Sequence, residues 1–159
     1  MVTFELNGAD VYVEAPATMT LLDMLRVELG VKSVKKGCEQ GECGACTVLI
    51  DGYPMTSCII LAPQAEGHHV CTIEGLVDNP LMKELREAFM ENGAVQCGFC
   101  TPGMLLSAYA LLSENRHPTE EEVKTAIEGW RERAKELGPE AVEYQKKLEE
   151  AWVKAKPKS

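Results

Sequence analysis

Cysteines are the residues of this 159-residue chain whose spacing most clearly indicates chemistry, and there are seven of them. Four lie within 21 residues, in the arrangement Cys38-x4-Cys43-x2-Cys46-x11-Cys58. Cys97 and Cys100 form a separate C-x-x-C pair, and the isolated Cys71 is interpreted as a small core residue of a strand. The first residues have neither the basic region nor the apolar region of a secretory signal. An odd number of cysteines then favours reduced thiols or metal thiolates over a disulfide framework.

The four clustered cysteines predict a [2Fe–2S] site. C-x4-C-x2-C followed by a distant fourth cysteine is the plant-type spacing for this cluster, which needs two thiolates on each iron. Gly37, Gly41 and Gly44 let the loop wrap a compact inorganic core and bring backbone N–H groups close to the sulfurs. Zinc is a weaker alternative, since its four-thiolate sites usually combine paired C-x2–4-C knuckles. Structural thiols without metal are the remaining alternative.

The elements that must position these cysteines indicate an α+β chain. Residues 1–76 alternate between short strands and one helix, and an Asn-Gly or Asp-Gly pair marks each hairpin turn. In order, we predict strands at Val2–Leu6 and Val11–Ala15, a helix at Thr20–Leu29, a hairpin around Thr47–Ile50 and Met55, and a strand at His69–Ile73.

Residues 77–159 predict four helices. Asn79-Pro80 and Thr101-Pro102 have the composition of helix starts, and Thr119 with Glu122 resembles a capping box. The helix after Pro102 is apolar nearly all round, which indicates a buried central helix. A last amphipathic helix is expected from Ala141 to Trp152. From Arg131 to Lys156, 19 of 26 residues are Ala, Glu, Lys, Leu or Arg, a composition typical of an idealised helical hairpin.

Composition excludes some classes of function. The chain carries 16 basic against 25 acidic residues, a net charge of −9, whereas a nucleic-acid surface needs the opposite sign. No apolar stretch approaches the roughly 20 residues of a membrane-spanning helix. We therefore expect a cytoplasmic protein with neither nucleic-acid nor membrane partners.

Several segments together resemble the iron–sulfur small subunit of the molybdenum hydroxylase family, which includes xanthine dehydrogenases, aldehyde oxidoreductases and aerobic carbon monoxide dehydrogenases. They are residues 37–52, 72–76, 96–104, Asn115 and 118–123. The resemblance implies a β-grasp ferredoxin-like domain over residues 1–76 and a four-helix-bundle domain over residues 77–159. It also implies that the four clustered cysteines hold the cluster remote from the active site, that Gln96 contacts a pterin cofactor, and that the partners are a large molybdopterin subunit and a flavin subunit.

The second cysteine pair departs from the family pattern. In the family, the counterparts of Cys97 and Cys100 are completed by a later Cys-Arg-Cys-Thr-Gly-Tyr motif, expected here from position 132. Glu132 and Ala134 stand at the two cysteine positions, and no cysteine follows Cys100. We therefore expect one [2Fe–2S] cluster, with the second absent or incomplete. The pair is interpreted as remnant thiols, the alternatives being a redox dithiol, a zinc site with Glu132 or His117, or an exchangeable cluster site.

These observations predict one-electron transfer by the small subunit of a molybdenum hydroxylase-type oxidoreductase, with no catalysis on its own. A stand-alone or engineered single-cluster ferredoxin-like protein is the alternative, suggested by the idealised C-terminal composition. A zinc-bearing interaction module is a weaker one.

Overall fold

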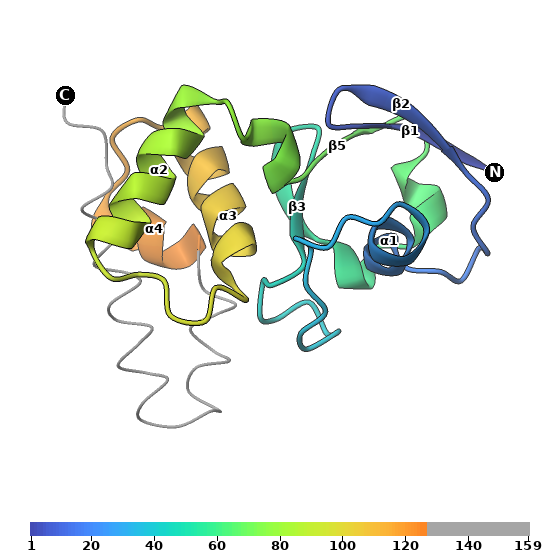
Figure 1. The fold of residues 1–159 in the computed structure, drawn as a ribbon, viewed down its shortest axis with the longest axis horizontal. Coiled ribbons are helices and arrows are strands. Elements are labelled where there is room, and N and C mark those ends of the chain that lie inside the picture. The colour runs from blue at the N-terminus through green and yellow to red at the C-terminus, as the bar shows by residue number, and fades with distance from the viewer. Residues whose placement is uncertain (127–159) are drawn as a thin grey trace.

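The computed structural model describes residues 1–126 of the chain. A five-stranded sheet with short helices lies beside a group of longer helices (Figure 1). The predicted helix from Ala141 to Trp152, and the end of the helix that begins near Thr119, fall outside the described residues. Among the described residues, every helix is too short or too polar to cross a membrane.

The sheet is mixed, with the strand order β2-β1-β5-β3-β4. Its strands are β1 (Val2–Leu6), β2 (Ala9–Val13), β3 (Thr47–Ile50), β4 (Tyr53–Thr56) and β5 (His69–Cys71). The middle strand, β5, pairs in parallel with β1, and the other three pairs are antiparallel. Both predicted hairpins are confirmed: Asn7-Gly8 and Asp51-Gly52 have positive φ at both positions, as two-residue primed turns require.

β5 is shorter than the predicted strand. After Cys71 the backbone N–H of Thr72 donates to the Asn7 side chain at 2.8 Å, rather than to a neighbouring strand. The chain then enters the 3-10 turn η4 (Ile73–Leu76). This side-chain contact explains why the sheet ladder stops two residues early.

The predicted helix at Thr20–Leu29 is confirmed in position but not in geometry. Thr20 caps it by accepting the Asp23 N–H at 3.1 Å, and Gly30 ends it at φ +68°. Only α1 (Leu21–Asp23) is α-helical, and η1 (Met24–Glu28) forms a wider π turn in which Leu29 N–H donates to the Met24 carbonyl. The wider turn rotates less per residue, so closely spaced apolar side chains can all face the sheet. The four that do so are fully buried: Leu21, Leu22, Met24 and Leu25.

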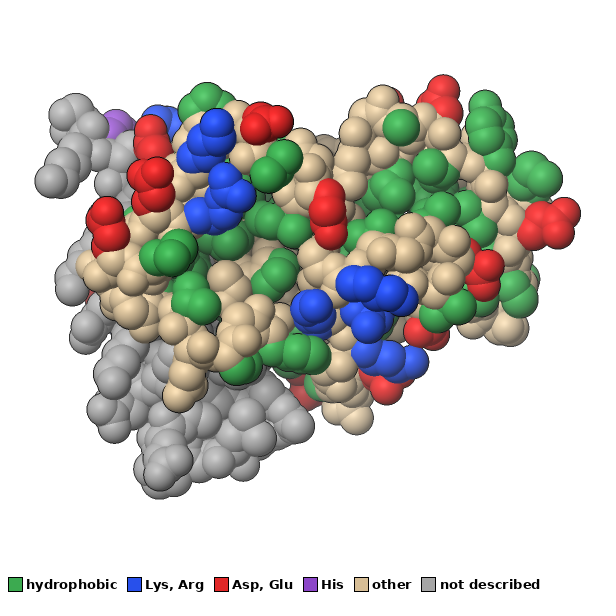
Figure 2. Space-filling model, in the orientation of Figure 1, with side chains coloured by type: hydrophobic (Ala, Val, Ile, Leu, Met, Phe, Trp, Pro, Cys, Tyr) green, Lys and Arg blue, Asp and Glu red, His purple; other side chains and the backbone are tan. Residues whose placement is uncertain are grey.

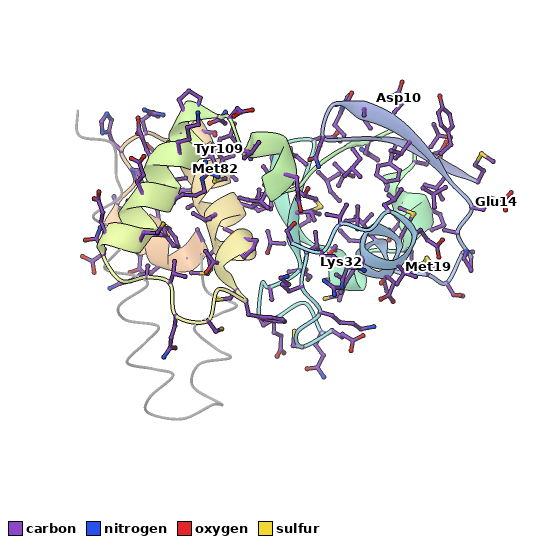
Figure 3. All side chains as sticks on the ribbon, viewed as in Figure 1. Asp10, Glu14, Met19, Lys32, Met82 and Tyr109 are labelled. Atoms are coloured by element: carbon purple, nitrogen blue, oxygen red, sulfur yellow. The ribbon has the colours of Figure 1, made fainter. Side chains whose placement is uncertain are left out.

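Three helices form the second part: α2 (Pro80–Glu91), α3 (Thr101–Glu114) and α4, described over Glu120–Ala126. Asn79 caps α2 through the Met82 N–H, and its amide also reaches the Tyr109 hydroxyl of α3 at 3.3 Å. Figure 3 labels Met82 of α2 and Tyr109 of α3. The Thr119–Glu122 capping box is confirmed. The start of α3 differs from the prediction, because its N-cap is Cys100 and Thr101 is already helical.

β3 joins the two parts because it is buried on both faces. Val48 and Ile50 belong to the apolar core beneath α1, whereas Leu49 packs into the core of α2 and α3. Two shorter turns, η2 (Ser57–Ile59) and η3 (Ala62–Ala65), close the sheet side. The strand that follows the cysteine loop is therefore fixed from both sides, and β3 lies between α1 and α3 (Figure 1).

Candidate metal centre

A glycine-rich loop at residues 37–46 carries three of the clustered cysteines into β3, and the fourth, Cys58, follows β4 in η2. The backbone turns sharply at Gly41 and Gly44, with φ of +76° and +73°. Ser57 joins the two segments: its N–H donates to the Cys46 carbonyl at 3.3 Å, and its hydroxyl donates to the same oxygen at 2.7 Å. The expected convergence of a tight loop with a neighbouring hairpin is thus present in the fold.

The four thiols gather as two neighbouring pairs. The Cys38 and Cys43 side chains interact with each other, and the Cys58 thiol interacts with that of Cys46. Cys58 is also close enough to Cys38 for a charge on one to disfavour a charge on the other. In the part of the chain that the structure describes, no three His, Cys, Asp or Glu side chains surround a single metal-ion position. The contacts between the thiols therefore pair Cys38 with Cys43 and Cys46 with Cys58.

Backbone N–H groups point at the sulfurs of the loop. Gln40, Glu42 and Cys43 donate to the Cys38 Sγ at 3.3 to 3.4 Å. Cys38 and Ala45 donate to the Cys43 Sγ at 3.5 Å. Donors aimed at sulfur stabilise negative charge on it, so this loop is built to hold thiolates.

The pKa values of these thiols follow from burial and hydrogen bonding. Burial would raise the pKa of Cys38, but the three backbone N–H groups outweigh it and lower the pKa to about 7. Burial raises the pKa of Cys43, and burial together with the neighbouring Cys46 thiol raises that of Cys58 to about 12. Cys38, at the more exposed edge of the loop, thus favours a thiolate, whereas Cys43 and Cys58 need a further positive charge before they ionise.

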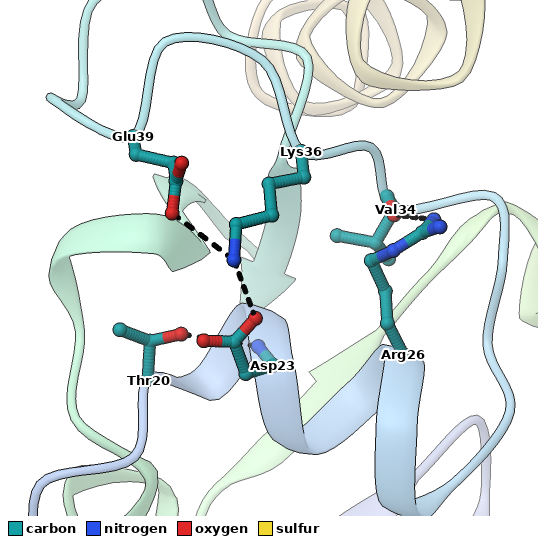
Figure 4. A network of polar contacts seen from close by, with 6 residues as sticks. All are labelled: Thr20, Asp23, Arg26, Val34, Lys36 and Glu39. Carbon is teal, nitrogen blue, oxygen red and sulfur yellow. Dashed lines mark hydrogen bonds and ion pairs between the residues drawn. The ribbon is translucent and has the colours of Figure 1, made fainter.

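Polar contacts fix the approach to the loop (Figure 4). The Lys36 ammonium lies 3.2 Å from the Asp23 carboxylate on α1 and 3.1 Å from that of Glu39 in the loop. Hydrogen bonds and charge from Glu39 and then Asp23 raise the pKa of Lys36. Arg26 donates to the Val34 carbonyl at 2.8 Å. These bonds tie the cysteine loop to the helix beneath it, on a side where Lys and Arg side chains gather (Figure 2).

The second cysteine pair lies at the start of α3, next to the first group. Cys97 is exposed and Cys100 is buried. Burial, then the nearby Cys97 and Cys43 thiols, raise the pKa of Cys100 to about 11. Gln96 is exposed in the same loop between α2 and α3. His117 lies beyond the far end of α3, and Glu132 lies outside the described residues.

Three side chains around the cysteine loop were not predicted from the sequence. For Lys36, the only sequence signal was the opposite charge of its partners, Asp23 and Glu39. Ile59 covers Gly41, where an added Cβ would lie 2.9 Å from the Ile59 Cδ1, and Phe99 lies against Gly37. Ile59 directly follows Cys58 and Phe99 directly precedes Cys100 in the sequence. That position next to a cysteine was the only sequence signal for either residue. Ile59 is 61% exposed and Phe99 46% exposed, so the cysteine group has an apolar rim.

Comparisons with known proteins agree with this geometry. Residues 4–73 match the 2Fe-2S iron-sulfur cluster binding domain, and residues 72–134 match a second family, the [2Fe-2S] binding domain. The nicotinate dehydrogenase small FeS subunit of Eubacterium barkeri is 46% identical over 128 residues, covering 80% of this chain and 82% of that protein. The xanthine dehydrogenase iron-sulfur-binding subunit of Escherichia coli O157:H7 is 44% identical over 111 residues, covering 70% of this chain and 69% of that one.

Solved structures agree as well. A chain of quinoline 2-oxidoreductase from Pseudomonas putida 86 superposes with a TM-score of 0.76 at 36% identity, covering 98% of this chain and 97% of its own. The aldehyde oxidoreductase of Desulfovibrio gigas gives a TM-score of 0.75 at 34% identity, covering 98% of this chain but 17% of that longer one. The matches favour an iron–sulfur small subunit over a stand-alone ferredoxin-like protein or a zinc-bearing interaction module. With two [2Fe–2S] binding domains in sequence and relatives matched over most of their length, this chain belongs to the iron–sulfur small subunits of the molybdenum hydroxylase family.

Proposed function

We propose that this chain carries one [2Fe–2S] cluster on Cys38, Cys43, Cys46 and Cys58 and passes single electrons through it. The observation that carries the proposal is the division of these thiols into two pairs, Cys38 with Cys43 and Cys46 with Cys58. A two-iron core requires two thiolates on each iron, and this donor set supplies them. When bound, the cluster supplies reversible one-electron chemistry.

The chain's own residues hold and tune this site. The N–H groups of Gln40, Glu42 and Cys43 stabilise negative charge on Cys38, and those of Cys38 and Ala45 do so on Cys43. Such contacts favour the more negative, reduced state and raise the reduction potential. The buried Cys43, Cys46 and Cys58 keep water from one side, and Cys38 is left at the more exposed edge.

For the second pair we propose remnant thiols rather than a complete cluster. Cys97 and Cys100 supply two thiolates, and the full sequence contains no later cysteine to complete a set of four. Cys100 is 6% exposed and belongs to the apolar core of the helices, which suits a packing role. A redox dithiol, a zinc site and an exchangeable cluster are the outcomes against which this proposal is tested.

The assembly is also a proposal. Relatives with a separate chain of this size are named as subunits, and in the aldehyde oxidoreductase the matched region is one part of a longer chain. Both facts support a large molybdopterin subunit as electron donor and a flavin subunit or an external acceptor. Gln96, exposed beside Cys97, is the residue we propose to face the pterin.

The architecture completes this proposal. A β-grasp domain at residues 1–76 followed by a four-helix bundle at residues 77–159 is supported by two family matches that meet near residue 73 and by two separate apolar cores. A cytoplasmic location stays a prediction that rests on the seven cysteines.

Iron and acid-labile sulfide analysis of anaerobically prepared protein, with EPR of the reduced sample, tests the cluster proposal. We expect two irons and two sulfides per chain and one rhombic signal. The double variant Cys97→Ala/Cys100→Ala is the matched control and should keep that count. Four irons per chain would contradict the remnant assignment. A colourless protein with stoichiometric zinc would contradict the cluster itself.

Co-purification tests the assembly: we expect this chain to be isolated together with a large molybdenum-containing subunit.

A further inference from the structure

The first turn of α3 packs closely against the backbone of the cysteine loop. Gly103 lies in the first turn of α3, and a Cβ added there would overlap the carbonyl oxygen of Gly44 and lie 3.5 Å from the Cα of Ala45. Gly44 and Ala45 are the two residues between Cys43 and Cys46. The helix backbone thus rests directly on the part of the loop that joins the two pairs of thiols.

Other contacts of the same turn reach the same loop. Cys100, the N-cap of α3, lies near Cys43, and Phe99 lies against Gly37. A cavity of about 190 Å³ lies beside this contact, lined by Cys43, Gly44 and Thr47 on one side and by Gly103 and Ser107 on the other.

The φ of Gly103 is not in the left-handed region, so its backbone does not require glycine. Glycine inside a helix lowers helix stability relative to alanine, which leaves close packing as the physical reason for it. The carbonyl of Gly44 also accepts hydrogen bonds from the Thr47 N–H at 3.1 Å and from the Thr47 hydroxyl at 2.7 Å. It is held from two directions and cannot move aside without disturbing the turn that leads to Cys46.

The geometry points to Gly103 as a positioning residue for the first cluster: the helical part of the chain sets the cysteine loop through this contact. The inference rests on the proposed function, because it concerns the same cluster. It adds that the ligand loop is not a self-contained unit of residues 1–76. An added methyl group at position 103 pushes the helix away from Gly44 and alters the spacing between the Cys43 and Cys46 sulfurs.

The test compares the full-length chain with Gly103→Ala and with Ser107→Ala, a control one turn later beside the same cavity. Each protein is loaded anaerobically, and the rate at which an iron chelator bleaches the visible absorption is measured together with the EPR g-values of the reduced sample. We expect Gly103→Ala to bleach roughly tenfold faster or more, the scale on which outer contacts change metal affinity, and to show shifted g-values. Ser107→Ala should match the parent.

Far-ultraviolet circular dichroism separates this effect from loss of folding. A purely helical role predicts that Gly103→Ala stabilises α3 and leaves bleaching and g-values unchanged, and that result overturns the inference. If Gly103→Ala does not fold, Pro102→Ala loosens the same turn without adding atoms, and hydrogen exchange at the Gln40 and Glu42 amides should then be faster than in the parent. Unchanged exchange there also overturns the inference. A parent chain without a [2Fe–2S] signal would instead refute the proposed function.

Discussion

Gly37→Ala is a small change that should act directly on one sulfur. A Cβ at position 37 would lie 2.7 Å from the Cys43 Sγ, against at least 3.4 Å in ordinary contact, so the sulfur or the backbone must move by about 0.7 Å. The φ of Gly37 lies outside the left-handed region, and alanine therefore introduces no backbone strain of its own. Ligands must usually be held within about 0.5 Å of their working positions. We expect retention of the cluster to weaken roughly 10- to 100-fold, or about 1.4 to 2.7 kcal/mol.

The assay for Gly37→Ala is iron content after gel filtration, together with the rate of bleaching by a chelator. Gly75→Ala is the matched control, because an added Cβ there collides with the Asn7 side chain, away from the cysteine loop, and its φ is also outside the left-handed region. The control should lower the unfolding temperature and leave the iron count intact. If Gly37→Ala kept its iron as firmly as Gly75→Ala, the assignment of the Cys43 sulfur to the cluster would be refuted.

Three further changes test other parts of the structure. Cys43→Ser should lose the cluster and destabilise the sheet domain, since metal binding is coupled to folding, and an unchanged visible spectrum would contradict the ligand assignment. Cys71→Ala should leave that spectrum unchanged, because the half-buried Cys71 is not among the grouped thiols, and bleaching would show otherwise. Burial disfavours the Glu74 carboxylate, but hydrogen bonds from Thr72 and Ser33 outweigh it and hold its pKa below the usual 4.5. This stabilisation is present above pH 4.5 and is lost as the pH falls through the lower pKa of the folded state. The unfolding temperature of Glu74→Gln should therefore fall less steeply between pH 6 and pH 3.5 than that of the parent chain. Equal slopes in the two proteins would contradict this assignment.

The local elements were predictable because their signals are local. Asn7-Gly8 and Asp51-Gly52 adopt positive φ wherever they occur between alternating strands, and Thr20 and Asn79 bond to backbone groups three residues away. The convergence of the four clustered cysteines followed from their spacing and from the number of thiolates that a two-iron core needs. These predictions required no knowledge of how the two parts of the chain pack.

The remaining features depend on tertiary packing, which spacing does not encode. The π turn of η1 arises because residues beneath the sheet must share one face, and Thr101 enters α3 because Cys100 takes the capping position. The contact of Gly103 with Gly44 joins segments 59 positions apart. A glycine inside an otherwise apolar helix was the only sequence signal for it, and that signal indicates close packing without naming the partner.

The parallel pairing of β1 with β5 has a consequence for how the protein is made. Glu5 pairs with His69 and Leu6 with Val70, so the middle of the sheet cannot form until some 65 further residues have left the ribosome. Pairings between distant segments form slowly because a long loop must close first. All four clustered cysteines therefore leave the ribosome before the sheet around them is complete, and their thiols are unprotected by the finished fold until β5 has paired with β1.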